Sequence, residues 1–213
     1  LGSFETAQTV RYRIFTSNES TSWFSFDVLT VRELGTPTAL YTDGQAIRAA
    51  FPGGVTLSFE GGACLQISLA LGTASGTICE NAVLPLPEGF SLEIVKSEKI
   101  WELKRFSKQV CRGDGLLLYT RADGSPAKVH TRVYMPCKQV LGTGERFDAV
   151  NQKGRGTNGR VVEKFTCQGE QSYLPVPFFL TEQGLGWYRE SDIPAQMRFD
   201  DGMTITQETE GDL

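Results

Sequence analysis

Leu141-Gly-Thr-Gly-Glu-Arg-Phe-Asp-Ala-Val-Asn-Gln-Lys-Gly154 is the most informative segment of this chain. Two further segments follow it: Val161-Val-Glu-Lys-Phe-Thr-Cys-Gln-Gly169 and Tyr173-Leu-Pro-Val-Pro-Phe-Phe-Leu180. In all three, short apolar runs alternate with Gly, Pro, Asn and Gln. This pattern is typical of short strands joined by turns.

The same segments are rich in side chains that suit a sugar. Amide groups both donate and accept hydrogen bonds, as sugar hydroxyls require, and aromatic rings can cover the C–H face of a sugar ring. A polar turn packed on core aromatic residues is the alternative interpretation. The residues concerned are Asn151, Gln152, Asn158, Gln168, Gln171, Phe147, Phe165 and Tyr173.

Outside these segments the chain also has the pattern of an all-β protein. Apolar residues alternate with polar ones at period two, and turn residues separate the runs. We therefore predict a sandwich of antiparallel sheets, with hairpins over residues 64–84 and 115–134. The predicted strands cover residues 10–14, 23–29, 55–59, 64–71, 77–84, 115–120, 127–134, 178–180, 186–188 and 203–206.

Residues 98–110 do not follow this pattern clearly. Ile100, Leu103 and Phe106 recur at a spacing of three, which suits a helix. The alternation of Ile100, Glu102 and Lys104 also fits a strand, so both structures remain open for this stretch.

Composition excludes several classes of protein. The 213 residues carry a net charge of -4 and a pI of about 5.2, whereas a nucleic-acid binder usually shows a basic face. No apolar run reaches the roughly 18 residues that span a membrane. The five cysteines lack a CxxC pair and there is one histidine, so we expect no metal or cofactor. We predict reduced thiols and a cytoplasmic location, with a Cys64–Cys79 bridge as the alternative for that pair.

The motifs that could indicate catalysis or ligand binding are weak. Gly154–Gly159 matches GxGxxG but lacks a buried strand before it and a helix after it, so we interpret it as a mobile loop. Glu145 is interpreted as an ion-pair partner of Arg146. Glycoside hydrolysis needs two carboxyl groups on opposite sides of a sugar, which neighbours along a chain rarely provide. No Ser-His-Asp arrangement is present.

Four motifs follow one another along the chain: Gly-x-Gly-Glu-Arg-Phe, Asn-Gln-Lys-Gly, Gln-Gly and Tyr-x-Pro-x-Pro-Phe-Phe. Their order resembles that of the family 31 glycoside hydrolases, the α-glucosidase and α-xylosidase group. The resemblance covers roughly residues 106–190. It implies that residues 1–213 form a single N-terminal domain, a galactose-mutarotase-like β-super-sandwich and a fragment of a larger enzyme. The implied partner is the enzyme's own C-terminal (β/α)8 catalytic domain.

The resemblance also implies a function. The parent would hydrolyse α-glucosides or α-xylosides with retention, using aspartates on the barrel, so this chain alone is expected to be inactive. A loop of this domain would reach the α-linked oligosaccharide substrate. Gln168 stands where some family members carry a sugar-contacting Asp, and Phe165 stands where an aromatic residue is often seen, so both are expected to bind substrate. An independent carbohydrate-binding β-sandwich is the alternative.

Overall fold

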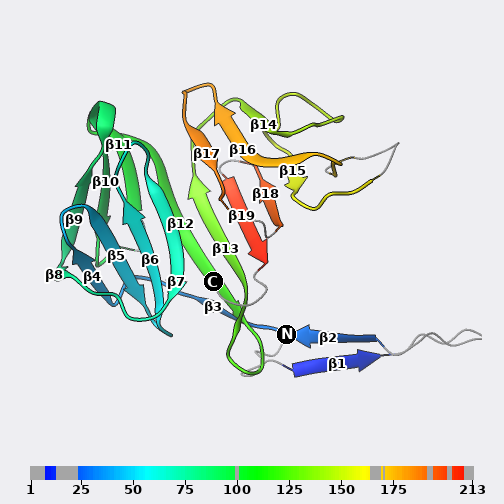
Figure 1. Cartoon of the computed structure of the whole chain (residues 1–213), viewed down its shortest axis with the longest axis horizontal. Coiled ribbons are helices and arrows are strands. Elements are labelled where there is room, and N and C mark those ends of the chain that lie inside the picture. Colours follow the sequence, from blue (N-terminus) through cyan, green and yellow to red (C-terminus); the bar gives the residue numbers. More distant parts are fainter. Residues whose placement is uncertain are drawn as a thin grey trace, which may run out of the picture.

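The computed structural model describes residues 8–12, 24–98, 101–163, 169, 171–190, 194–200 and 203–208 (Figure 1). Within this part of the chain the regular structure is β-sheet, apart from one short 3-10 turn, η1 (Pro87–Gly89). The prediction of an all-β fold with antiparallel sheets is confirmed.

One long sheet runs through the molecule, in the order β15-β18-β19-β13-β12-β11-β10-β9, with β3 also paired to β12. Its strands are β3 (Thr30–Glu33), β9 (Asn81–Pro85), β10 (Phe90–Val95), β11 (Trp101–Arg105), β12 (Lys108–Thr120), β13 (Pro126–Tyr134), β15 (Gly156–Asn158), β18 (Ala195–Arg198) and β19 (Met203–Glu208).

Two smaller sheets and a separate hairpin complete the fold. The five-stranded sheet, in the order β7-β6-β5-β4-β8, consists of β4 (Ala39–Thr42), β5 (Ala46–Phe51), β6 (Val55–Glu60), β7 (Gln66–Leu71) and β8 (Thr77–Cys79). The three-stranded sheet, in the order β14-β16-β17, consists of β14 (Val140–Gly144), β16 (Pro175–Thr181) and β17 (Gly186–Tyr188). The hairpin is formed by β1 (Gln8–Tyr12) and β2 (Phe24–Val28).

The strand register gives the long sheet one apolar face. Leu84 lies opposite Leu92, Leu92 opposite Leu103, and Leu103 opposite Cys111, so these side chains share a face. Both smaller sheets cover this face, the five-stranded sheet at one end and the three-stranded sheet at the other (Figure 1). The long sheet is therefore a common layer beneath two separate cores.

Each core is built around fully buried aromatic residues. Phe59 centres the core beneath the five-stranded sheet, and Phe179 packs edge to face on Phe199 in the other, with ring centroids 5.1 Å apart. Trp101 packs against both cores. Burial of such large rings contributes more stability than burial of any other side-chain type here.

A β-bulge lets strand β12 serve both cores. Cys111 belongs to one core and Leu118 to the other, and their odd spacing would put them on opposite faces of a regular strand. The pairing with β13 shifts register between Gly113 and Gly115, which inserts one extra residue. Both side chains therefore point to the covered face.

Several local predictions need correction. The hairpin over residues 64–84 is wrong: β7 pairs with β6, β8 with β4, and β9 with β10. The chain moves from one sheet to another at Glu80, and period-two alternation predicts a strand but not its partner. Cys64, Cys79, Cys111 and Cys137 are free thiols, so the alternative Cys64–Cys79 bridge is absent.

From Trp101 onward, the open stretch 98–110 forms strands rather than a helix, because β11 covers Trp101–Arg105 and β12 begins at Lys108. β11 and β12 form a hairpin whose two turn residues, Phe106 and Ser107, have φ values of 47° and 65°. Positive φ at both positions matches the right-handed twist of the flanking strands. The predicted hairpin over residues 115–134 is confirmed as β12 and β13.

Candidate functional site

The loop between β14 and β15 contains the amides that the sequence suggested for sugar binding, and it uses them internally. The Asn151 Oδ1 accepts hydrogen bonds from the backbone N–H groups of Val140 and Lys153, at 3.0 and 3.1 Å. Its Nδ2 donates to the Lys138 carbonyl at 3.3 Å. Asn151 therefore fixes the loop against β14, and the interpretation as a polar structural turn holds for this residue.

Gln152 is fully buried beneath the same loop. Its Nε2 donates to Asp148 Oδ1 at 3.2 Å and to the Ala149 carbonyl, and Asp148 Oδ2 lies 3.2 Å from the Arg155 guanidinium. Burial alone would raise the pKa of Asp148, but the hydrogen bonds from Gln152 and Ala149 and the charge of Arg155 lower it. Asp148 is therefore a structural carboxylate that stays ionised.

The motif Gly-x-Gly-Glu-Arg-Phe begins with a tight contact between β14 and β16. A Cβ atom at Gly144 would lie 2.1 Å from the Leu174 carbonyl oxygen, and Gly144 has a φ of +92°. The Arg146 guanidinium folds back and donates to the carbonyl of the buried Thr143 at 2.8 Å. These contacts place Glu145 and Phe147 at the surface.

Phe147 and Tyr173, two of the aromatic candidates for sugar contact, form an exposed pair. Their ring centroids are 5.7 Å apart, and the side chains are 60% and 44% exposed. A hydrogen bond with Glu145 raises the pKa of the Tyr173 hydroxyl. The Ser172 hydroxyl donates to the Glu145 carbonyl at 2.7 Å, which holds the two segments together.

The two predicted substrate-binding residues, Phe165 and Gln168, lie outside the described residues, so their roles stay predictions. The described flanks of this segment are close in space, because Val161 bridges to Ser172 and the Val162 N–H donates to the Ser172 carbonyl at 3.0 Å. The described residues on both flanks therefore lie close to Tyr173.

The three-stranded sheet has an outer apolar face that sequence reasoning missed. We define this outer apolar face as Leu141, Val176, Leu180 and Tyr188. Leu141 lies directly opposite Leu180, and the exposed fractions of the four side chains range from 38% to 65%. The signal was present in the apolar residues of 176–180, but period two does not tell which side of a strand a neighbouring layer covers.

Exposed apolar side chains concentrate in this region of the chain. Of the fifteen large apolar side chains exposed in the described residues, nine fall between residues 141 and 188. Monomeric surfaces rarely gather such residues unless they are interaction sites. The nine are Leu141, Phe147, Val150, Val161, Tyr173, Leu174, Val176, Leu180 and Tyr188.

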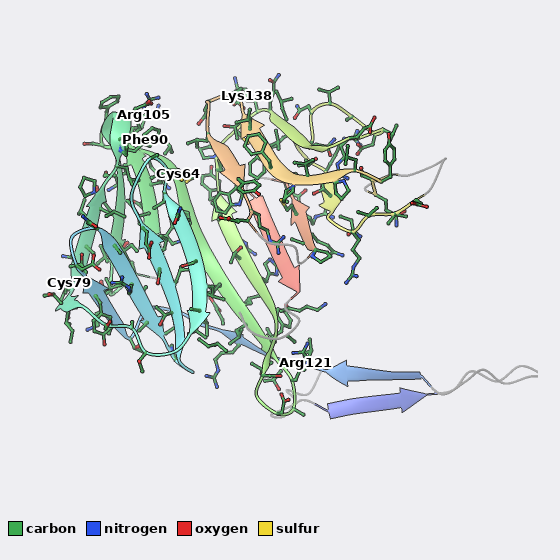
Figure 2. All side chains as sticks on the ribbon, in the orientation of Figure 1. Cys64, Cys79, Phe90, Arg105, Arg121 and Lys138 are labelled. Atoms are coloured by element: carbon green, nitrogen blue, oxygen red, sulfur yellow. The ribbon has the colours of Figure 1, made fainter. Side chains whose placement is uncertain are left out.

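A groove lies between the two smaller sheets and has a volume of about 330 Å³. Trp101, Leu103 and Cys111 of the long sheet line it, together with Ile67 of β7 on one side and Trp187 of β17 on the other. Cys64 and Phe90 also line this groove, and Figure 2 shows both at the end of the molecule where Arg105 lies. Sequence reasoning did not find the groove, because its walls come from distant segments.

The remaining motifs have structural explanations. Gly154–Gly159 contains strand β15 rather than a continuous mobile loop, and a Cβ atom at Gly159 would lie 2.8 Å from the Ala195 carbonyl oxygen. In the described residues no group of three His, Cys, Asp or Glu side chains could hold a metal ion. That part of the chain also has no helix long and apolar enough to cross a membrane.

Among known proteins, no protein-family model matches the chain. A 1,3-α-isomaltosidase of Kribbella flavida is 40% identical over 53 residues, which are 23% of this chain and 7% of that protein.

Solved structures share the fold over most of the chain. An uncharacterised protein of Listeria monocytogenes has a TM-score of 0.75 and 20% identity, covering 98% of this chain and 23% of that one. The cycloalternan-forming enzyme of Listeria monocytogenes, solved with a pentasaccharide substrate, has a TM-score of 0.71 and 20% identity over 89% of this chain and 21% of that one. A family 31 dextranase of Flavobacterium johnsoniae, solved with isomaltotriose, has a TM-score of 0.59 and 15% identity over 84% of this chain and 25% of that one.

These similarities show that the chain has the fold of a β-domain that a family 31 glycoside hydrolase contains, in agreement with the resemblance recognised from the sequence. The chain spans about a quarter or less of the length of each of these relatives.

Proposed function

We propose that this chain is the non-catalytic N-terminal domain of an α-glycosidase, and that it docks on a (β/α)8 catalytic barrel through its outer apolar face. The parent enzyme hydrolyses α-glucosides or α-xylosides with retention of configuration. The barrel carries the catalytic carboxylates, and this domain supports the barrel and contributes the segment of Phe165 and Gln168 to the substrate site. The proposed location is the cytoplasm, where the four described thiols stay reduced.

The observation that carries the proposal is the concentration of exposed apolar residues on and beside the three-stranded sheet. Interdomain interfaces bury roughly 600–1,500 Å². The outer apolar face and the Phe147–Tyr173 pair are joined through Leu174 and Pro175, which lead directly from the pair into β16. A barrel seated there would cover both and would bring its active site close to the segment that contains Phe165 and Gln168.

The test uses the full-length product of the gene. The double substitution Leu180→Asp/Tyr188→Asp places two charges on the outer apolar face without touching either core. We expect it to separate the unfolding of the two domains and to lower hydrolysis of nitrophenyl α-glucoside and α-xyloside at least several-fold. A charge buried in an interface without a partner costs several kcal/mol, roughly 3–5.

The matched control is Ile78→Asp, a charge placed at an equally exposed apolar position on strand β8 of the five-stranded sheet. It should leave domain coupling and hydrolysis unchanged. A full-length protein whose domains unfold independently before any substitution would contradict the proposal, as would an active double variant with wild-type coupling. The nitrophenyl glycoside that is hydrolysed faster shows whether the parent enzyme prefers an α-glucoside or an α-xyloside.

A further inference from the structure

The groove between the two smaller sheets is separate from the outer apolar face, because it opens on the other side of strand β17. Neighbouring residues of a strand point to opposite faces, so Trp187 lines the groove while Tyr188 belongs to the outer face. The docking proposal does not use the groove.

Aromatic side chains line three sides of this groove. Trp101 lies on its floor, Trp187 on one wall and Phe90 at one end, and all three are half-buried. The Trp101 indole lies flat against strand β12, because a Cβ atom at Gly113 would come within 2.2 Å of its Nε1. Glycine at position 113 thus makes room for the ring at the bottom of the groove.

A carboxylate at the rim of the groove is paired with a positive charge beside it. Glu88 lines the groove, and its Oε2 lies 3.8 Å from the Arg105 guanidinium. Arg105 is in turn held over the rings of Phe90 and Phe106, at 5.0 and 5.6 Å from their centroids. The charged groups are thereby positioned beside aromatic surface, although both are substantially exposed to solvent.

The backbone beneath this rim is in an uncommon conformation. Glu88 has a φ of 56°, which non-glycine residues rarely adopt. The neighbouring hairpin turn at Phe106 is tied to it, since the Phe106 N–H donates to the Gly89 carbonyl at 2.8 Å. Backbone strain of this kind often accompanies a binding role.

We infer that this groove is a second, non-catalytic carbohydrate site, which binds one or two glucosyl units of an α-glucan. Trp101, Trp187 and Phe90 cover the C–H faces of the sugar rings, and Glu88 accepts hydrogen bonds from hydroxyl groups. The volume of about 330 Å³ lies at the lower end of ligand sites, roughly 300–1,000 Å³. The choice of an α-glucan rests on the proposed function.

Isothermal titration of the 213-residue chain with isomaltotriose and with maltotriose tests the inference, with cellotriose as the β-linked comparison. We expect saturable millimolar binding of at least one α-linked trisaccharide. Trp187→Ala should weaken it by about tenfold, the loss of one aromatic contact. Glu88→Ala should weaken it several-fold, because it removes the hydrogen-bond acceptor without affecting either core, so the test stands even if Trp187→Ala misfolds.

Tyr188→Ala is the matched control, because it removes the adjacent aromatic ring from the opposite face of the same strand. It should leave sugar affinity unchanged. The inference is overturned by a lack of binding of both α-linked trisaccharides, by equal affinity of Glu88→Ala and the wild type, or by a groove that binds the apolar dye anilinonaphthalene sulfonate but no sugar. Failure here is distinguishable from failure of docking, which is read from the outer face in the full-length protein.

Discussion

At the scale of single residues, the backbone geometry of the 141–154 segment explains why glycine occupies particular positions in it. Gly142 and Gly144 have φ values of +115° and +92°, and both approach the backbone of the β16 segment closely. A side chain at either position would be strained by its backbone conformation and would also collide with a neighbouring strand. The glycines are required by geometry, independently of any ligand.

Gly144→Ala should therefore lower the free energy of unfolding by more than about 2 kcal/mol, since it combines a strained φ with a contact to backbone that cannot move away. Gly124→Ala is the control: its φ of +84° is similar, but nothing lies within 4 Å of the new Cβ atom. It should cost about 1 kcal/mol. Urea unfolding of both variants measures the difference, and equal losses would show that the close approach to Leu174 is unimportant.

At the scale of elements, strand β16 shows how one short segment serves two surfaces. Phe179 is fully buried in a core, whereas its neighbour Leu180 is 43% exposed on the outer apolar face. Proline lacks an N–H group, so Pro175 and Pro177 need an edge or a bulge of a sheet. β16 is the central strand of its sheet, and the register shift in its pairing with β14 provides the irregularity.

This alternation predicts very different costs for two adjacent truncations. Phe179→Ala should lower the free energy of unfolding by about 3–5 kcal/mol, because it leaves a cavity opposite Phe199. Leu180→Ala in the isolated chain should cost less than about 1 kcal/mol, because that side chain is already in contact with solvent. Thermal unfolding compares them, and a large loss for Leu180→Ala would mean that this side chain is covered in the free domain.

At the scale of the whole molecule, the long sheet connects the two cores. Strand β12 contributes Cys111 to one core and Leu118 to the other, and Trp101 packs against both. Burial raises the pKa of the Cys111 thiol to about 12, in keeping with its position inside the layer. In the described residues, both smaller sheets pack their apolar faces against this common layer.

The 213-residue chain should consequently unfold in one cooperative transition. Phe59→Ala alters the core beneath the five-stranded sheet and Phe179→Ala the other, and each should shift the same single midpoint, by far-UV circular dichroism and by tryptophan fluorescence alike. Two separate transitions, or a variant that shifts only one probe, would show that the long sheet does not couple the cores.

Whether a structural feature could be predicted from the sequence depends on how far apart along the chain its interacting residues lie. The all-β class and the strands predicted at 23–29, 55–59 and 127–134 depend on side-chain alternation, which neighbouring residues determine. The structure has these strands at Phe24–Val28, Val55–Glu60 and Pro126–Tyr134. The exposed Phe147 and Tyr173 were candidates from sequence, whereas Asn151 and Gln152 proved to be internal because their partners lie on β14 and within their own loop.

The sequence by itself therefore determined the β-sandwich class and the likeness to family 31, because both depend on the order of short sequence motifs along the chain. The tertiary structure alone decided which strands pair, where the chain crosses between sheets, and which side of β16 and β17 stays uncovered. The groove also forms only in the tertiary structure, because its walls come from residues more than a hundred positions apart. Alternation marks two faces on every strand, but only the packing of one layer on another decides which face is buried.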